Sequence, residues 1–298
     1  MPLAAIDAKT RLLAVLGDPI GHSLSPAMHN LALEWLAEAG IPLNYRYLAF
    51  HVSPERLATT VRGLAAMGCR GFNATIPHKE ALLPLMDGLT LEASQVGAVN
   101  TVIIDDNGKL SGHNTDVGGF VAAAQQEFGQ PPTAGVAILL GAGGAARAVL
   151  AALPRLGIKQ IIVVNRHQER AQTLIEQLAP TLPAIALRSA SWQEVPSLLP
   201  DCQWLVNTTS IGLQGDTPEM ALVRQTLQRM PTTAKIIDIV YGARPTPLLE
   251  QAMALGLACS DGLPMLVYQG AEAFERWTGQ TMPSQKILQH LRQRIQSR

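Results

Sequence analysis

The sequence predicts an α/β protein made of two α/β domains. At 298 residues, 47% of them hydrophobic and 15% charged, the chain is long enough to bury two cores. Short apolar runs alternate with helical patterns along most of its length, which is the order of elements in βαβ units. The clearest unit spans residues 136 to 166 and contains a glycine-rich turn.

This unit reads as a strand, a turn, a helix and a second strand. Val136–Leu140 is apolar throughout, as expected of a strand buried on both faces. The turn that follows consists of small residues: Gly141, Ala142, Gly143, Gly144, Ala145 and Ala146. Such a turn lets a pyrophosphate approach the backbone beside a helix N-terminus, whose free N–H groups and dipole favour an anion. The pattern predicts a Rossmann-type dinucleotide-binding domain; a glycine turn without a ligand is the alternative.

The residues after the second strand indicate which dinucleotide binds. An NAD site places Asp or Glu at the end of that strand, whereas this chain has Asn165 and Arg166, with Arg170 one turn further on. Two guanidinium groups suit a 2′-phosphate, so we predict NADP. The alternative is that both arginines only decorate a solvated helix start.

Composition excludes several classes of function. The formal net charge is zero, so no basic field marks the chain for nucleic acid or a membrane surface. Cys69, Cys202 and Cys259 are odd in number and far apart, which argues against a disulfide framework or a zinc site and favours the reducing cytoplasm. No secretion signal or membrane-length apolar run is found, and nothing indicates a metal. The oligomeric state stays open, a homodimer included.

In the first half, polar residues cluster at strand and helix ends. Ser23 and Ser25 lie beside a predicted helix N-terminus, a geometry that suits a carboxylate, although their positions alone favour a cap role for Ser25 and a turn role for Ser23. The segment 71–79 is expected to pass from a strand into a helix with Lys79 in its first turn, where a cation opposes the dipole. Asn73, Thr75 and Lys79 are then candidates to face a cleft; an ordinary surface lysine is the alternative for Lys79.

Further candidates follow along the chain. Asn100 starts a strand that leads into a hairpin turn, and Asp116 lies in the first turn of a helix, where a plain capping role is the alternative. The first domain is expected to end near residue 115. Further along the chain, Thr208, Ser210 and Tyr241 are candidates at strand ends, and Gln269 is a candidate in a later helix. A capped turn explains the first two as well, and Gln269 is either a satisfied core amide or a ligand contact.

Taken together, the chain resembles the shikimate/quinate dehydrogenase family from about Leu13 to Trp277. The resemblance is carried by motifs in a fixed order: Ser23 to Pro26, Asn73 to Lys79, Gly97 to Thr101, Asn114 to Asp116, Gly141 to Ala146, Asn165 with Arg166, and Tyr241. It departs at Ala74, where a larger apolar residue is frequent, and at His167, where threonine often follows Asn-Arg.

The resemblance implies an N-terminal substrate-binding domain of residues 1–115 with 263–298, to which the C-terminal helices return, and an NADP-binding domain of residues 116–262. It implies NADPH-dependent reduction of 3-dehydroshikimate to shikimate in the chorismate and aromatic amino-acid pathway, with Lys79 and Asp116 as the catalytic pair. The residues that it implies for substrate contact are Ser23, Ser25, Thr75, Asn100, Tyr241 and Gln269. It also implies that Gly262 and Met265 lie near the nicotinamide.

Two other functions are open at this stage. A dual quinate/shikimate dehydrogenase commonly takes NAD, and Asn165 in place of an acid counts against it. A dinucleotide-binding regulator without catalysis has no need of a proton-transfer pair, so the presence of both Lys79 and Asp116 counts against that one.

Overall fold

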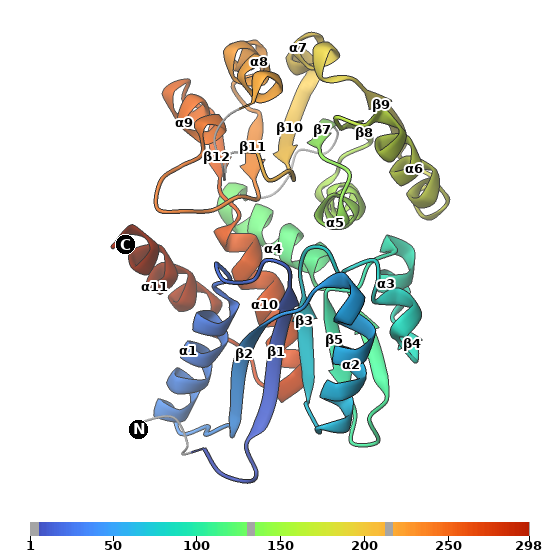
Figure 1. Cartoon of the computed structure of the whole chain (residues 1–298). Helices are drawn as coiled ribbons and strands as arrows, with labels where there is room; N and C mark the ends of the chain where they lie inside the picture. The colour runs from blue at the N-terminus through green and yellow to red at the C-terminus, as the bar shows by residue number, and fades with distance from the viewer. Residues whose placement is uncertain (1–5, 130–134, 212–216, 298) are drawn as a thin grey trace. The chain divides into compact units, whose positions relative to one another are not determined.

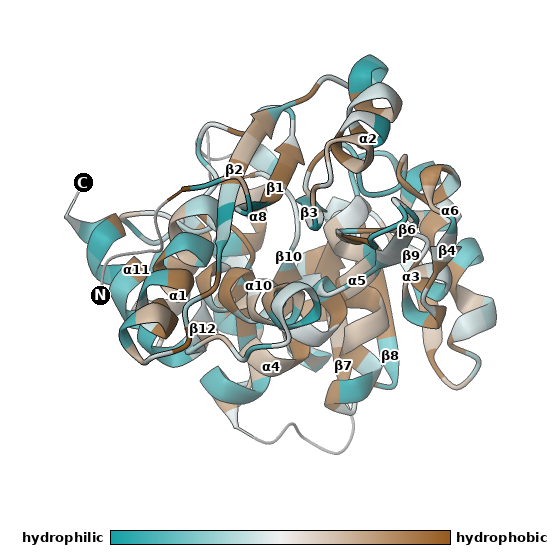
Figure 2. Ribbon diagram, turned by 90° about the horizontal axis from the view of Figure 1, so that it is seen from below, coloured by the Kyte–Doolittle hydropathy of each residue, from teal (hydrophilic) through white to brown (hydrophobic). Residues whose placement is uncertain are grey.

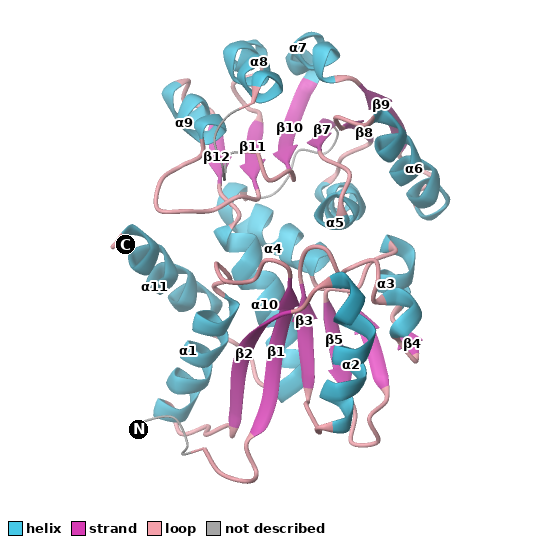
Figure 3. Cartoon of the chain, in the orientation of Figure 1, coloured by secondary structure: helices cyan, strands magenta, loops and turns pink. Residues whose placement is uncertain are grey.

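A computed structural model describes residues 6–129, 135–211 and 217–297. The chain divides into two compact units (Figure 1). Unit 1 comprises Met1–Gly119 with Leu266–Leu291, and unit 2 comprises Phe120–Met265 with Arg292–Arg298. Each unit holds one sheet lined by helices (Figure 3), so the predicted α/β class is confirmed. The assignment of functions to residues 1–115, 116–262 and 263–298 stays a prediction, because compactness does not show what each part binds.

Unit 1 contains a mixed six-stranded sheet in the order β2-β1-β3-β5-β6-β4. Its strands are β1 (Arg11–Gly17), β2 (Tyr45–His51), β3 (Gly71–Ala74), β4 (Gly88–Leu89), β5 (Thr101–Ile104) and β6 (Leu110–His113). β1 is parallel to β2 and β3, whereas β5 is antiparallel to both β3 and β6. The β5–β6 pair confirms the predicted hairpin.

Helices cover both faces of this sheet. They are α1 (Ser25–Glu38), α2 (Leu57–Ala66), α3 (Leu91–Val96), the start of α4 (Asp116–Phe128), most of α10 (Leu263–Thr278) and α11 (Ser284–Gln296), with 3₁₀ turns at Pro54–Arg56 and Leu83–Leu85. One core packs β1, β3 and β5 against α2 and α3, and a second packs the opposite face of β1 against α10.

The predicted helix start at Lys79 is wrong. Residues 75–82 form successive turns, in which His78 N–H donates to the Thr75 carbonyl and Leu82 N–H to the His78 carbonyl. A regular helix does not follow, so the expected conflict between the Lys79 charge and a helix dipole does not arise.

Unit 2 contains a fully parallel six-stranded sheet in the order β12-β11-β10-β7-β8-β9. Its strands are β7 (Val136–Leu140), β8 (Gln160–Val164), β9 (Ala186–Ala190), β10 (Cys202–Asn207), β11 (Lys235–Asp238) and β12 (Ala258–Ser260). Counted within the unit, the order is 6-5-4-1-2-3, which is the doubly wound arrangement of the Rossmann fold. The strand order reverses between β7 and β10, where such sheets bind dinucleotides.

The helices of unit 2 are the rest of α4, α5 (Gly144–Ala152), α6 (Gln168–Leu178), α7 (Val195–Leu198), α8 (Pro218–Thr226) and α9 (Pro247–Ala254). Shorter 3₁₀ helices span Leu153–Leu156, Ala179–Thr181, Trp192–Glu194, Leu199–Asp201 and Leu227–Arg229. One core packs the sheet against α7, α8 and α9, while Phe128 of α4 contacts Trp204 on the other face.

The hydropathy of the elements follows this layering. Strands β1 and β7 are coloured mostly hydrophobic in Figure 2, whereas α11 is largely hydrophilic. α8 and β12 were not predicted from the sequence. β12 is only three residues, Ala-Cys-Ser, and so carries too little pattern to be read locally. In the part of the chain that the structure describes, no helix combines the length and apolarity needed to span a membrane.

Candidate functional site

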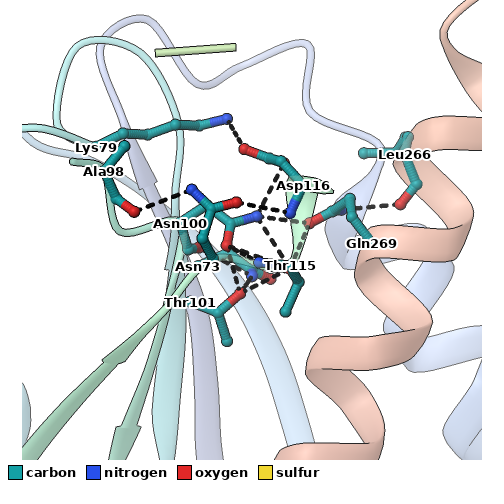
Figure 4. A network of polar contacts seen from close by, with 10 residues as sticks. Asn73, Lys79, Ala98, Asn100, Thr101, Thr115, Asp116, Leu266 and Gln269 are labelled. Carbon is teal, nitrogen blue, oxygen red and sulfur yellow. Dashed lines mark hydrogen bonds and ion pairs between the residues drawn. The ribbon is translucent and has the colours of Figure 1, made fainter. Parts of the chain in front are cut away.

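Lys79 and Asp116 form a nearly buried ion pair in unit 1 (Figure 4). The Lys79 Nζ to Asp116 Oδ2 distance is 2.6 Å, and the two side chains are 14% and 5% exposed. The Lys79 carbonyl accepts a hydrogen bond from Val99 N–H, which fixes the turn that carries it. Asn114 accepts from the Asp116 N–H and donates to the Ala98 carbonyl, which fixes the start of α4. The structure thus joins two residues 37 positions apart, which the family resemblance implied as a pair and which their own positions in the sequence suggested only separately.

Asn100 holds the other oxygen of the carboxylate. Its Nδ2 lies 2.9 Å from Asp116 Oδ1, 3.0 Å from Thr115 Oγ1 and 3.2 Å from Gln269 Oε1. Its Oδ1 accepts from the Thr115 N–H at 2.7 Å. Both Asp116 oxygens are therefore bonded, one to an ammonium and one to an amide, which orients the carboxylate. A residue that only capped α4 would bond backbone N–H groups of that helix, whereas both Asp116 oxygens bond the side chains of Lys79 and Asn100.

Gln269 reaches the same network from α10. Its Oε1 faces Asn100 and Thr115, and its Nε2 donates to the Leu266 carbonyl at 2.8 Å. Helices α4 and α10 approach closely here because Gly119 lacks a side chain: an added Cβ would lie 2.5 Å from Gln269 Cβ. Gln269 is therefore a satisfied amide, 8% exposed, within the polar network.

The network also contains residues for which no contact with substrate was predicted: Asn73, which was nominated only to face a cleft, and Tyr47, Thr101 and Thr115. Asn73 accepts from the Tyr47 hydroxyl at 2.7 Å and donates to Thr101 Oγ1 at 2.9 Å and to the Asn100 carbonyl at 3.1 Å. Asn73, Thr101 and Thr115 stand inside or beside the motifs already noted, so their positions gave a signal. Tyr47 gave none, because it reads as an ordinary strand residue.

The two serines lie on the α1 side of this network. Ser25 is buried, and Ser23 is half-buried with its Oγ 3.3 Å from the Ser25 N–H. Ser25 is not a helix cap, because α1 has no side-chain capping bond. Burial raises the pKa of Tyr47 well above 10, while a hydrogen bond from Ser25 acts in the opposite direction. Ser25 thereby connects through Tyr47 to Asn73.

Thr75 is also close in sequence to the pair but is held differently. It is half-buried, and its N–H donates to the Leu16 carbonyl at 2.9 Å. Among the described residues, no hydrogen bond joins the Thr75 or Ser23 side chain to Lys79 or Asp116.

In unit 2 the glycine-rich turn has the geometry of a phosphate cradle. Gly141 has φ +111°, and an added Cβ would lie 2.6 Å from Thr208 Oγ1, so only glycine fits. Thr208 donates through Oγ1 and N–H to the Leu140 carbonyl, which fixes the ends of β7 and β10 together. Gly143 precedes α5 with open space where a Cβ would be and without a side-chain cap. The first N–H groups of α5 can therefore receive a pyrophosphate.

The end of β8 carries no carboxylate that could bind a ribose diol. Asn165 is half-buried and donates to the His167 carbonyl at 3.0 Å, while Arg166 and Arg170 are exposed. Exposed guanidinium groups at this place fit a 2′-phosphate. After β10, which neighbours β7 on the side away from β8, Thr208 is half-buried and Ser210 is exposed.

The remaining predicted residues also lie in unit 2. Tyr241 is half-buried just after β11. Gly262 is buried, and any Cβ there would overlap the carbonyl of Ile239. Met265 is buried at the start of α10. Their predicted contacts with substrate or nicotinamide stay predictions.

Three family models match most of the chain. They are described as shikimate dehydrogenase substrate binding domain, shikimate / quinate 5-dehydrogenase and shikimate 5'-dehydrogenase C-terminal domain, and they match residues 15–102, 122–246 and 262–292 respectively.

Individual proteins are similar over nearly their full lengths. A shikimate dehydrogenase (NADP(+)) of Magnetococcus marinus is 51% identical over 97% of this chain and 98% of its own. A structure of shikimate 5-dehydrogenase from Thermus thermophilus in complex with NADP(H) and shikimate has TM-score 0.77 and 36% identity, covering 95% of this chain and 99% of that one. A quinate dehydrogenase from Corynebacterium glutamicum in complex with NAD has TM-score 0.84 and 28% identity, covering 95% and 98%.

Proposed function

This chain belongs to the shikimate dehydrogenase family, and on that premise we propose that it reduces 3-dehydroshikimate to shikimate with NADPH, reversibly, in the chorismate and aromatic amino-acid pathway. The observation that supports this assignment most directly is the nearly buried Lys79–Asp116 pair, with both carboxylate oxygens bonded. A protein that only sensed a dinucleotide would have no use for an ammonium held in this way.

Lys79 is the proton donor in this proposal. Bound NADPH supplies the hydride. As the C3 carbonyl of the substrate is reduced, negative charge builds on its oxygen, and the Lys79 ammonium both stabilises that charge and transfers a proton to it. In the reverse direction Lys79 takes the proton back from the C3 hydroxyl. Asp116 stays a carboxylate and keeps the ammonium in place, while Asn100 prevents that carboxylate from turning away.

The other predicted residues bind the rest of the substrate. Ser23 and Ser25 offer hydroxyl groups to its carboxylate. Thr75, Asn100, Gln269 and Tyr241 offer donors and acceptors to its hydroxyl groups. The cofactor would be held by the turn of Gly141, Ala142, Gly143, Gly144 and Ala145, by Asn165, Arg166 and Arg170 at the 2′-phosphate, and by Thr208, Ser210, Gly262 and Met265 toward the nicotinamide. The cradle geometry of the turn supports the first of these groups.

We also propose that the protein works in the cytoplasm. All three cysteines are free, and Cys202 is fully buried with its pKa raised to about 12 by burial. Cysteines that form no disulfide are usual in proteins of a reducing compartment, where thiols are kept reduced.

The test is a steady-state assay of the purified protein. Reduction of 3-dehydroshikimate should be at least about tenfold more efficient, as kcat/KM, with NADPH than with NADH, because charged contacts to a phosphate are worth more than 1.4 kcal/mol. With NADP, shikimate should be oxidised and quinate should react far more slowly. Comparable turnover of quinate with NAD would favour the quinate dehydrogenase alternative, and no turnover of any pair would leave a binding protein.

A further inference from the structure

Two buried polar side chains at the ends of β10 and β11 have no part in the function described so far. Asn207 and Asp238 are register partners on neighbouring parallel strands, and both are fully buried. Asn207 Nδ2 donates to Asp238 Oδ1 at 2.9 Å. Among the described residues, the Asp238 carboxylate accepts hydrogen bonds from three neutral donors: the Asn207 amide, the Val240 N–H at 3.1 Å and the Thr246 hydroxyl at 2.7 Å.

Asp238 closes the loop that carries Tyr241. Val240 lies on one side of Tyr241 and Thr246 on the other, and both donate to the same carboxylate. The two bonds tie both ends of residues 239–246 to the end of β11. Thr246 also caps α9, because its Oγ1 accepts from the Leu249 N–H. The position of Tyr241 therefore depends on Asp238.

Asn207 holds the loop after β10, which carries Thr208, Thr209 and Ser210. Its Oδ1 accepts from Thr209 through N–H at 3.1 Å and Oγ1 at 2.7 Å. Thr209 lies between Thr208 and Ser210, the residues proposed to lie along the dinucleotide. Through the Asn207–Asp238 bond, the cofactor loop and the Tyr241 loop are held by one buried pair.

This arrangement costs stability. Burial raises the pKa of the Asp238 carboxyl from 3.8 to about 6, and the nearby Asp261 carboxylate acts in the same direction. At neutral pH, burying a neutral side chain here would cost less free energy than burying the Asp238 carboxylate. The benefit of the carboxylate lies in the three donors that it fixes at once.

We propose that Asn207 and Asp238 are positioning residues that hold the Tyr241 loop and the Thr208–Ser210 loop in their working arrangement. They touch neither substrate nor cofactor in this account, and act through Tyr241 and through the backbone of the cofactor loop. The proposal rests on the function given above, in which Tyr241 contacts the substrate.

Thr246→Val tests the pair with little change of shape, because it replaces the Thr246 hydroxyl, which bonds Asp238 and also caps α9, with a methyl group. It should lower kcat/KM for shikimate by about ten- to a hundredfold, as expected when a substrate contact is misplaced, with NADPH binding changed less than about twofold. Thr246→Ser restores the hydroxyl and should restore activity. The matched control is Thr217→Val, because Thr217 caps α8 through the Met220 N–H without reaching Asp238. It should leave kcat/KM unchanged.

Hydrogen exchange by mass spectrometry gives a readout that does not need activity. In Thr246→Val and in Asp238→Asn, exchange of the peptide covering residues 239–246 should speed up, while the peptide covering β7 stays protected. If Thr246→Val does not fold, Asp238→Asn with the same two measurements replaces it.

Unchanged exchange, unchanged kcat/KM, equal damage by Thr217→Val, or no rescue by Thr246→Ser would each overturn the positioning role. A wild-type protein that does not oxidise shikimate would overturn the proposed function instead, and the exchange data would still decide whether the pair holds the loop.

Discussion

Lys79 and Asp116 share one ion pair, so we expect that substitutions of the two residues will not affect turnover independently. The carboxylate has no described partner other than Lys79 and Asn100 on its side-chain oxygens. Without the Lys79 ammonium, Asp116 no longer has the group that it is proposed to orient. Residues that act as a unit give non-additive losses when they are changed together.

Lys79→Ala should lower kcat by about 10²- to 10⁴-fold, the usual contribution of a general acid, with a smaller change in the KM of shikimate. Asp116→Asn should lower kcat less, and the double variant should be no worse than Lys79→Ala alone. Steady-state kinetics measure all three, and Lys109→Ala, in the exposed turn before β6, is the matched control. A near-normal kcat for Lys79→Ala, or multiplicative losses in the double variant, would contradict the paired role.

At the scale of elements, the turn between β7 and α5 contains two glycines needed for different reasons. Gly141 has a positive φ and no space for a side chain, whereas Gly143 has an ordinary φ of −98° and open space around its Cβ position. We therefore expect the fold to require the first glycine and the proposed pyrophosphate contact to require the second.

Gly141→Ala should therefore destabilise unit 2 by about 1–3 kcal/mol through backbone strain, and weaken NADPH binding as well. Gly143→Ala should leave the melting temperature unchanged and still weaken NADPH binding, because the new methyl group occupies space near the phosphate. Thermal melts and NADPH titrations separate the two effects. If Gly143→Ala binds NADPH normally, the pyrophosphate does not lie on this turn.

The turn between β8 and α6 carries Arg166 and the start of α6 carries Arg170, which we propose to contact the 2′-phosphate and so to select NADP over NAD. Arg166→Ala with Arg170→Ala should raise the KM of NADPH by about 10- to 100-fold, the value of one or two charge-assisted contacts. The KM of NADH should change little, since NADH has no 2′-phosphate. Arg229→Ala, at an exposed arginine of the same unit, is the control. Equal losses with both cofactors would place the arginines elsewhere than at the 2′-phosphate.

At the scale of the whole molecule, the two units should respond to acid in opposite directions. In unit 1 His29 is fully buried, stacks on Tyr47 and has no described partner for either ring nitrogen, so burial lowers its pKa from 6.5 to about 3. Between pH 6.5 and about 3, His29 is protonated in the unfolded chain and neutral in the folded chain. The stability of unit 1 therefore falls as the pH falls below 6.5. In unit 2 the raised pKa of Asp238 has the opposite effect, and stability is lost as the pH rises from about 4 to 6.

Urea unfolding between pH 4.5 and 7 checks this. Trp35 and Trp277 report on unit 1, and Trp192 and Trp204 on unit 2, so Trp→Phe variants isolate each signal. The unfolding midpoint of unit 1 should fall toward pH 4.5, and His29→Phe, which keeps a ring against Tyr47, should remove most of that fall. A midpoint that is equally acid-sensitive in His29→Phe would show that other groups control it.

The candidate site shows what sequence patterns can and cannot predict. Lys79, Asp116, Asn100 and Gln269 were each nominated from their places in motifs or elements, but Tyr47 was not, because a tyrosine in a strand has no pattern that marks a hydrogen bond to Asn73. The helix expected at Lys79 was wrong for a related reason. Local propensity did not reveal that residues 75–82 are held as turns by bonds such as His78 Nε2 with the Val52 carbonyl, 26 positions away.

Short-range periodicity and residue types at fixed spacing were enough to predict the α/β class, the glycine-rich turn with its strand and helix, and the family, which implied Lys79 and Asp116 as a pair. The folded chain was needed for the strand orders of the two sheets, the atoms through which Lys79 and Asp116 meet, the contact of Asn100 with Gln269 across 169 positions, and the burial of Asn207 with Asp238. These depend on which strands become neighbours and which faces are covered, and that follows from packing of the whole chain.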